Sequence, residues 1–264
     1  KNIALLKAIE LDPDFILFID DDNRPHKSYF KDWYDVLTKP TTKQVVCDSN
    51  VQHPWHNYLR TGDTKIPFYP RGFPITFRDQ EYITTIEDSI PISTDKIGVF
   101  QGISLGDPDI DAMTRIVYSA PTPLNSIQEK NFCMKNIWSP YNTQNTLFSK
   151  SLFPLAFTWP NSGRYEDIYA SLVWQQFIFN NDMYVHIGDA INNQIRGKRN
   201  DVHDLSLEVE GYLNIENVWS DILKISALTP TGFIEDLIKS NNPIIKKEQT
   251  FFSSYLNDLI RIGY

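Results

Sequence analysis

An apolar run of five residues, Phe15–Ile19, is followed directly by three aspartates, Asp20, Asp21 and Asp22. Such a run, bounded by turn residues, is typical of a strand buried on both faces, as in parallel sheets. Residues 1–10 carry apolar side chains at helical spacing, so a helix feeds directly into this strand. A helix in that place indicates that another strand precedes it. The sequence therefore predicts an α/β fold that is entered after its first unit.

The rest of the chain alternates between helical and extended patterns. Helices are expected over residues 27–40 and 165–179 and from 217 onward, strands over 43–47, 97–103 and 183–187, and a short helix or extended turn over 109–117. Residues 50–80 and 119–145 are expected to be loops. With no internal repeat and no Gly/Ser linker, the simplest organisation is an α/β domain over 1–212 with a helical extension over 213–264.

Composition narrows the class of partner. The chain has 264 residues, of which 41% are hydrophobic and 22% charged, as in a folded domain. A formal net charge of −8 argues against nucleic acid or an anionic membrane surface as the main partner. No apolar run approaches the roughly 20 residues that span a bilayer. Two cysteines are too few for a disulfide framework or a zinc site. They fit a cytoplasmic protein, with the Golgi lumen as the alternative if a membrane anchor lies upstream.

The aspartate triplet is the strongest chemical signal. Active sites of open α/β sheets lie beyond the carboxyl ends of their strands, which is where the triplet stands. Neighbouring carboxylates repel one another unless cations compensate them, and Mg²⁺ and Mn²⁺ prefer oxygen ligands. Alternation along the strand end sets Asp20 and Asp22 on one side as metal ligands, with Asp21 on the other and assigned to the bound nucleotide. The alternative is a solvated acidic turn.

Further stretches accompany the triplet in order along the chain. They are Lys1-Asn2-Ile3, Ala8-Ile9, Tyr69–Pro74, Gln101-Gly102, Gly106–Ala112, Tyr141–Thr146, Phe153-Pro154-Leu155, Arg199-Asn200 and His203-Asp204. With the apolar strand and its aspartates, the chain resembles nucleotide-sugar glycosyltransferases of the glycosyltransferase-A type. More narrowly it resembles the STELLO-like glycosyltransferases, and more distantly the reversibly glycosylated polypeptides, which are UDP-arabinopyranose mutases. The similarity runs to about residue 212.

The resemblance implies a mostly parallel, glycosyltransferase-A-like sheet flanked by helices, a nucleotide-sugar donor, usually linked to UDP, and Mn²⁺ or Mg²⁺ at Asp20 and Asp22. It implies transfer of the sugar to a carbohydrate acceptor, with inversion at the anomeric carbon. In this fold the nucleoside is held mainly by the first βαβ unit, which we expect to be missing or shortened here. The alternatives are a sugar-nucleotide mutase or self-glycosylating protein, and a non-catalytic accessory domain that binds nucleotide sugar or a partner transferase. An oligomer is compatible with each.

Basic residues are expected near the diphosphate. Arg71 can neutralise it bidentately, and Gly72 lets the backbone approach a ligand, although a surface arginine beside a turn glycine is the alternative. Arg196 and Arg199 belong to a basic group whose charge suits a departing diphosphate. By the resemblance, His203 of the same group completes the metal shell, whereas a solvated or structural histidine is the simpler interpretation.

Glu166 and Asp167 open a predicted helix after a Pro- and Gly-containing loop. Many inverting members of the superfamily carry an acidic pair at such a junction. By that similarity Asp167 is the base that deprotonates the acceptor hydroxyl, with Glu166 second. The alternative is that acidic residues stand in the first turn of a helix because its dipole favours them there. In the mutase alternative, Arg164 matters more than Asp167.

A second acidic cluster, Asp107, Asp109 and Asp111, follows the strand expected at 97–103. It is a candidate for binding sugar hydroxyls or a second cation, and equally for an ordinary turn in which an aspartate caps a short helix. By the resemblance, Asn142, Gln144 and Arg164 are also assigned to the substrate. Three aromatic residues are candidates for stacking on an acceptor sugar, with core packing as the alternative: Trp138, Tyr141 and Trp159.

Overall fold

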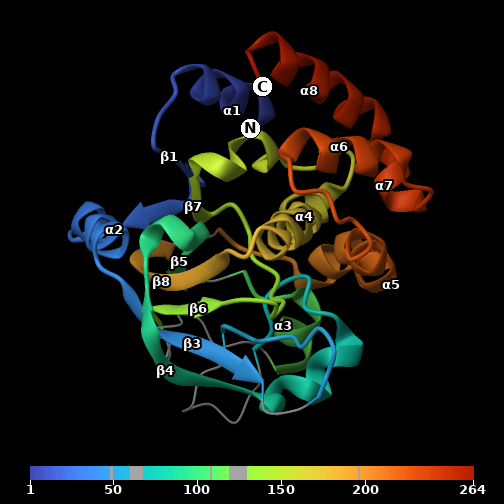
Figure 1. Cartoon of the computed structure of the whole chain (residues 1–264). Coiled ribbons are helices and arrows are strands. Elements are labelled where there is room, and N and C mark those ends of the chain that lie inside the picture. The colour runs from blue at the N-terminus through green and yellow to red at the C-terminus, as the bar shows by residue number, and fades with distance from the viewer. Residues whose placement is uncertain (48–49, 60–67, 108, 119–129, 196) are drawn as a thin grey trace.

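The computed structural model describes residues 1–47, 50–59, 68–107, 109–118, 130–195 and 197–264. It is an α/β fold in which an open mixed sheet is flanked by helices and followed by a helical C-terminal region (Figure 1). The α/β class and the C-terminal helices agree with the sequence prediction.

The strands are β1 (Phe15–Ile19), β2 (Asn23–Pro25), β3 (Thr41–Cys47), β4 (Thr84–Ile92), β5 (Ile97–Gly106), β6 (Phe132–Met134), β7 (Asn145–Ser149) and β8 (Tyr184–Gln194). The α-helices are α1 (Asn2–Glu10), α2 (Tyr29–Thr38), α3 (Ala112–Tyr118), α4 (Glu166–Asn180), α5 (Asp201–Ile222), α6 (Pro230–Lys239), α7 (Pro243–Lys247) and α8 (Gln249–Arg261). Short 3₁₀ segments are η1 (Ile75–Ile83), η2 (Thr94–Lys96), η3 (Lys150–Leu155) and η4 (Gly163–Tyr165).

The sheet has the strand order β1-β7-β5-β8-β6-β3-β4, with β2 paired to β8. Strand β7 is antiparallel to both β1 and β5, while β5 is parallel to β8. Strands β1, β5 and β8 therefore run in the same direction. The sheet is mixed, whereas the sequence predicts a mostly parallel one. The reason is that β7 runs antiparallel to both of its neighbours and the short β6 runs antiparallel to β8.

Strand β1 is less buried than its apolar run predicts. Ile16 is buried, but Phe15 is 37% exposed and Ile19 is 42% exposed. The reason is its place in the sheet, since β1 stands at the end of the strand order and, among the described residues, pairs with β7 alone. It is a strand with apolar side chains on both faces and a pairing partner on one side.

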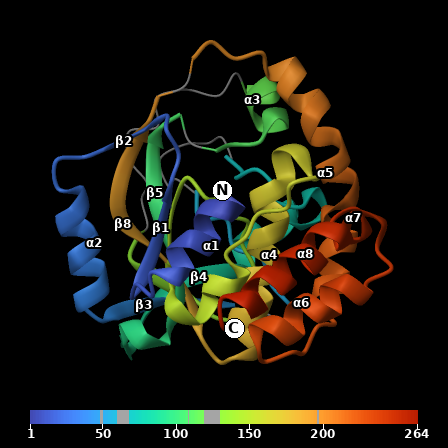
Figure 2. The same ribbon diagram turned by 90° about the horizontal axis from the view of Figure 1, so that it is seen from above.

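Helices cover both faces of the sheet (Figure 2). On one face, Tyr29 and Trp33 of α2 pack with Phe100 of β5 and Leu147 of β7. On the other face, buried residues of α1, α4 and α5 form one apolar cluster with strand residues such as Val99, next to Phe100 in β5. The change of face from Val99 to Phe100 is the alternation expected of a strand with a core on each side.

The C-terminal helices share a core with the sheet domain. Helix α5 runs unbroken through residue 212, where the sequence places the start of the extension. Phe252 of α8 is fully buried, and its ring lies 5.6 Å from that of Phe157, which follows η3. Within the described ranges, no helix is both long and apolar enough to cross a membrane.

The sheet brings the ends of four strands to one edge. Because β1, β5 and β8 run in the same direction, their carboxyl ends meet there, and the antiparallel β7 begins there. Most of the predicted site residues adjoin one of these ends or the start of α4, while Arg71 and Gly72 stand in the loop before η1. The edge is where a candidate functional site can form.

Candidate functional site

The aspartates after β1 form a tight turn. The main-chain N–H of Asn23 donates to the carbonyl of Asp20 at 3.2 Å, which closes the turn over Asp21 and Asp22. Asp21 is exposed, while Asp20 and Asp22 are partly buried. Asp21 is thus the most exposed of the three. A turn carries them rather than an extended strand, and the assignment of Asp20 and Asp22 to one side stays a prediction. The Asp22 carboxylate accepts a hydrogen bond from Gln194 Nε2 at 3.2 Å, at the end of β8.

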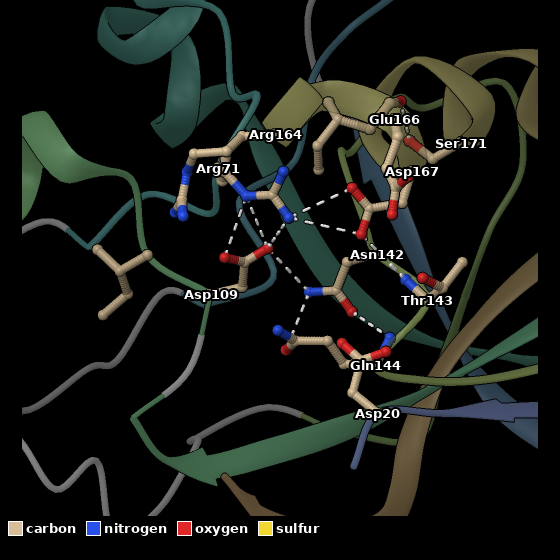
Figure 3. A network of polar contacts seen from close by, with 12 residues as sticks. Asp20, Arg71, Asp109, Asn142, Thr143, Gln144, Arg164, Glu166, Asp167 and Ser171 are labelled. Atoms are coloured by element: carbon tan, nitrogen blue, oxygen red, sulfur yellow. Dashed lines mark hydrogen bonds and ion pairs between the residues drawn. The ribbon is translucent and has the colours of Figure 1, made fainter. Parts of the chain in front are cut away.

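A buried guanidinium stands at the centre of the site. Arg71 donates from Nη2 to Asp109 Oδ2 at 2.7 Å and to Asp167 Oδ1 at 3.3 Å, and from Nε to Asp109 Oδ2 at 3.0 Å (Figure 3). All three side chains are at least nine-tenths buried. The two carboxylates raise the pKa of Arg71 well above its usual value, although burial opposes them. The guanidinium therefore stays charged and joins two acidic segments.

The loop that carries Arg71 is fixed by its backbone. Arg71 N–H donates to the carbonyl of Asp109 at 2.9 Å, and Asp111 N–H donates to the carbonyl of Tyr69 at 3.1 Å. Gly72 has φ +88°, and a Cβ there would lie 2.2 Å from Cγ2 of Ile168 in α4. Glycine at 72 thus allows the Arg71 loop to approach α4. The contact of Arg71 and Gly72 with a diphosphate stays a prediction.

Asn142 and Gln144 connect the arginine to the aspartate turn. Asn142 Nδ2 donates to Asp109 Oδ2 at 3.2 Å, and its Oδ1 accepts from Gln144 N–H at 3.0 Å (Figure 3). The carbonyl of Gln144 accepts from Asp20 N–H at 3.3 Å. Both side chains are buried and engaged within the protein. Their position fits a supporting role, which holds Asp20 at a fixed place relative to Arg71.

The two acidic residues at the start of α4 differ in environment. Asp167 is buried and accepts from Arg71 and, at 3.4 Å, from the main-chain N–H of Thr143. The Glu166 side chain is 39% exposed. Burial, and then the charge of Asp167, raise the pKa of Glu166. Glu166 is therefore the member of the pair that reaches solvent, and its carboxyl group has the raised pKa.

Lys1 is the site residue to which sequence reasoning gave no role. Its Nζ donates to Thr143 Oγ1 at 2.9 Å and lies 3.2 Å from Asp20 Oδ1 and 3.8 Å from Glu166 Oε1. The charges of Asp20, Asp167 and Glu166 raise the pKa of Lys1, although burial opposes them. Fold logic could have found it, because a helix that leads into a strand of a parallel unit begins near the carboxyl end of that strand.

The environment of Asp20 disfavours its charge. Burial is the largest cause that raises the pKa of Asp20, and the negative charges of Asp167 and Asp22 add to it, while Lys1 acts in the opposite direction. The pKa of Glu166 is raised as well. Lys1 and Arg71 only partly offset the burial of these carboxylates, and an additional cation would stabilise their ionised forms.

Several predicted residues are engaged with α5 instead. Arg164 donates to Glu208 Oε1 from Nε at 3.2 Å and from Nη2 at 3.0 Å, and the Glu208 side chain is fully buried. Asp111 accepts from Thr114 N–H at 2.8 Å, which caps α3, and from Tyr212 of α5 at 2.9 Å. Of the two interpretations of the cluster Asp107, Asp109 and Asp111, the one in which an aspartate caps a short helix therefore applies to Asp111.

Asp107 and Arg199 form an ion pair beside the end of β8. Their closest atoms are 3.4 Å apart, and Arg199 also contacts Asp204 at 3.0 Å. Asp107 N–H donates to the carbonyl of Gln194, the residue whose side chain binds Asp22. Arg199 is thus connected to the aspartate turn through β8.

The remaining predicted residues have varied positions. His203 lies in the first turn of α5, where its N–H donates to Asn200 Oδ1 at 3.1 Å, and its metal role stays a prediction. Arg196 lies outside the described residues. The three aromatic side chains that are candidates for stacking on an acceptor sugar are all buried in the core, as the alternative states: Trp138, Tyr141 and Trp159.

No protein-family model matches the chain, and no curated protein matches it in sequence. In the part of the chain that the structure describes, no three His, Cys, Asp or Glu side chains are grouped as a metal site.

The donor set nevertheless fits Mg²⁺ or Mn²⁺ in one common arrangement. Mg²⁺ is usually bound by one or two carboxylates together with substrate phosphates and water, rather than by a cage made entirely of protein ligands. Asp20 and Asp22 supply two carboxylates, and the ammonium of Lys1 already stands as a cation against Asp20.

We predict that Arg71→Met destabilises the protein by about 3–5 kcal/mol, because it leaves the buried Asp109 and Asp167 without their shared cation. Urea unfolding at neutral pH measures the change. Arg261→Met is the matched control, since Arg261 is 79% exposed in a surface pair and its loss should change stability by less than about 0.5 kcal/mol. Equal midpoints for Arg71→Met and the wild type would contradict this description of the site.

Proposed function

We propose that this chain is a metal-dependent glycosyltransferase of the glycosyltransferase-A type that moves a sugar from a nucleotide-sugar donor to a carbohydrate acceptor. The observation that supports it most is the gathering of Asp20 with Glu166 and Asp167 at the carboxyl edge of the sheet. These residues come from segments almost 150 residues apart in the chain, and the buried contacts of Arg71 hold Asp167 in place.

Asp20 and Asp22 hold the divalent cation in this proposal. When bound, Mn²⁺ or Mg²⁺ supplies positive charge that neutralises the leaving diphosphate. The acidic surroundings support a requirement for the divalent cation. Asp20 and Glu166 are already in an environment that disfavours negative charge, and a diphosphate without a cation would add more of it. Exposed Asp21 lies at the rim of the turn, where it is accessible to the nucleotide.

Glu166 acts as the base in this proposal, with Asp167 as its support. A general base must reach the acceptor hydroxyl and have a pKa closer to the working pH than a free carboxylate. Glu166 is partly exposed with a raised pKa, whereas Asp167 is buried and occupied by Arg71 and Thr143. Ionised Glu166 accepts the proton from the acceptor hydroxyl as the hydroxyl oxygen attacks the anomeric carbon and the diphosphate leaves.

The mutase alternative has less support. It gives the central role to Arg164, whose guanidinium is committed to Glu208 and to Asp204 at 3.4 Å. An arginine with both sides of its fork in ion pairs is a poor candidate for accepting a sugar. The non-catalytic alternative shares the donor site with the proposal and differs only in turnover, so activity assays separate the two.

We predict that Mn²⁺ and UDP together stabilise the protein and that Asp20→Asn or Asp22→Asn removes the effect. At ligand concentrations 100-fold above Kd, stabilisation of about 2.7 kcal/mol should raise Tm by roughly 5–10 °C. Differential scanning fluorimetry measures the shift. Asp14→Asn, an exposed aspartate at the other end of β1, should retain it. A shift that is the same in EDTA, or in Asp20→Asn, would refute the site.

We predict that Glu166→Gln lowers transfer or hydrolysis of a UDP-sugar by about 10²–10⁴-fold while the stabilisation by Mn²⁺ and UDP persists. In the wild type, kcat/KM should fall as the pH drops below the pKa of Glu166, which lies above 4.5, because the base must be ionised. Glu235→Gln, on the exposed side of α6, is the control. Full activity in Glu166→Gln would assign the base elsewhere. A wild type that binds UDP without turnover would support the non-catalytic alternative.

A further inference from the structure

We infer that Lys1 is a tethered cation that takes the place of the divalent ion in the nucleotide-free protein, so that the metal enters with the diphosphate rather than alone. The inference rests on the proposed function and adds an order of binding to it. It begins from the geometry of the Lys1 ammonium, whose Nζ contacts Asp20, Thr143 and Glu166 within 3.8 Å.

The Lys1 ammonium lies between two carboxylates. Its Nζ is 3.2 Å from Asp20 Oδ1 and 3.8 Å from Glu166 Oε1. One of these carboxylates, Asp20, is a proposed metal ligand. A metal ion that binds Asp20 must therefore compete with an ammonium that is attached to the same chain.

The start of α1 is anchored, and the Lys1 side chain is partly exposed to solvent. Asn2 Oδ1 accepts from Thr158 N–H at 2.9 Å, and Asn2 Nδ2 donates to the carbonyl of Thr158 at 2.9 Å. The Lys1 side chain itself is 36% exposed. A lysine is a point charge on a flexible stem, so its ammonium can leave Asp20 without moving the helix.

These features make the two ligands cooperative. A divalent cation that arrives alone displaces the ammonium from Asp20 and remains close to it, which two like charges disfavour. A cation that arrives with a diphosphate brings phosphate oxygens that can accept the ammonium, so the ion pairs of Lys1 are exchanged rather than lost. By linkage, UDP must then increase the affinity for the metal, and the metal must increase the affinity for UDP by the same factor.

The test is a titration of Mn²⁺ followed by electron paramagnetic resonance, with and without saturating UDP. In the wild type we expect weak binding of Mn²⁺ alone and tight binding with UDP. Lys1→Met should increase the affinity for Mn²⁺ alone by on the order of tenfold or more, with a smaller change when UDP is present. The factor by which UDP improves Mn²⁺ binding should fall accordingly.

Two variants control for the charge and for the position. Lys1→Arg keeps the positive charge and should resemble the wild type. Lys7→Met removes an exposed lysine of the same helix, which pairs with Glu10, and should change neither affinity. Together the two variants separate the effect of the positive charge at position 1 from the effect of losing any positive charge or of disturbing helix α1.

The outcomes distinguish this inference from the proposed function. If Lys1→Met and the wild type bind Mn²⁺ alone with equal affinity, while both bind it tightly with UDP, the tethered cation is wrong and the metal site stands. If Lys1→Arg increases the affinity as Lys1→Met does, the charge is not the cause, which also overturns the inference. If no protein binds Mn²⁺ in the presence of UDP, the metal site and the inference both fail.

Discussion

The buried contacts of Arg71 are the interaction on which the arrangement of the site depends. The guanidinium joins Asp109, which follows β5, to Asp167 in the first turn of α4, and its own loop pairs with the backbone of residues 109–111. A buried ion pair adds little net stability compared with apolar packing, but removing one partner is costly. Its value here is positional, because it fixes the helix that presents Glu166 to the edge of the sheet.

The charge of the site follows from that arrangement. Fixing Asp167 beside Glu166 brings two carboxylates toward Asp20. Burial is the main cause that raises the pKa of both Glu166 and Asp20, and the charge of Asp167 adds to it. Lys1 compensates part of this charge, because its ammonium contacts both Asp20 and Glu166. The acidity that the sequence concentrates at three points along the chain is thus divided in the fold. Part of it forms the candidate site, and part, including Asp111, joins α3 to α5. Glu208 of α5 adds to this connection, since it accepts from Ala112 of α3 and from Arg164 of η4.

Local patterns predicted the elements that stand beside the site. The apolar run of β1 with its aspartates, the helix at 165–179 and the strand at 97–103 all appear close to their expected bounds. Strand β7 was not predicted, since only Thr146, Leu147 and Phe148 favour a strand and Asn145 and Ser149 favour turns. Its entry between β1 and β5 is a long-range event that no local pattern contains, and it makes the sheet mixed.

The grouping of site residues was predictable in part. Residues that follow strands of one direction, such as β1 and β5, can be placed at one edge from the sequence, because strand direction alone decides that. The division of labour between Glu166 and Asp167 was not, because it depends on a contact between Asp167 and Arg71 across 96 residues of sequence. The commitment of Arg164 to Glu208 was equally hidden, since α5 carries its partner.

The central claim is that the carboxyl edge of β1 binds a divalent cation together with a nucleoside diphosphate. Crystals grown with Mn²⁺ and UDP, measured at a wavelength where manganese scatters anomalously, test it directly. We predict an anomalous peak at about 2.0–2.3 Å from carboxylate oxygens of Asp20 or Asp22, with the diphosphate as a further ligand. UDP bound with no peak at this turn, or a peak elsewhere on the protein, would contradict it.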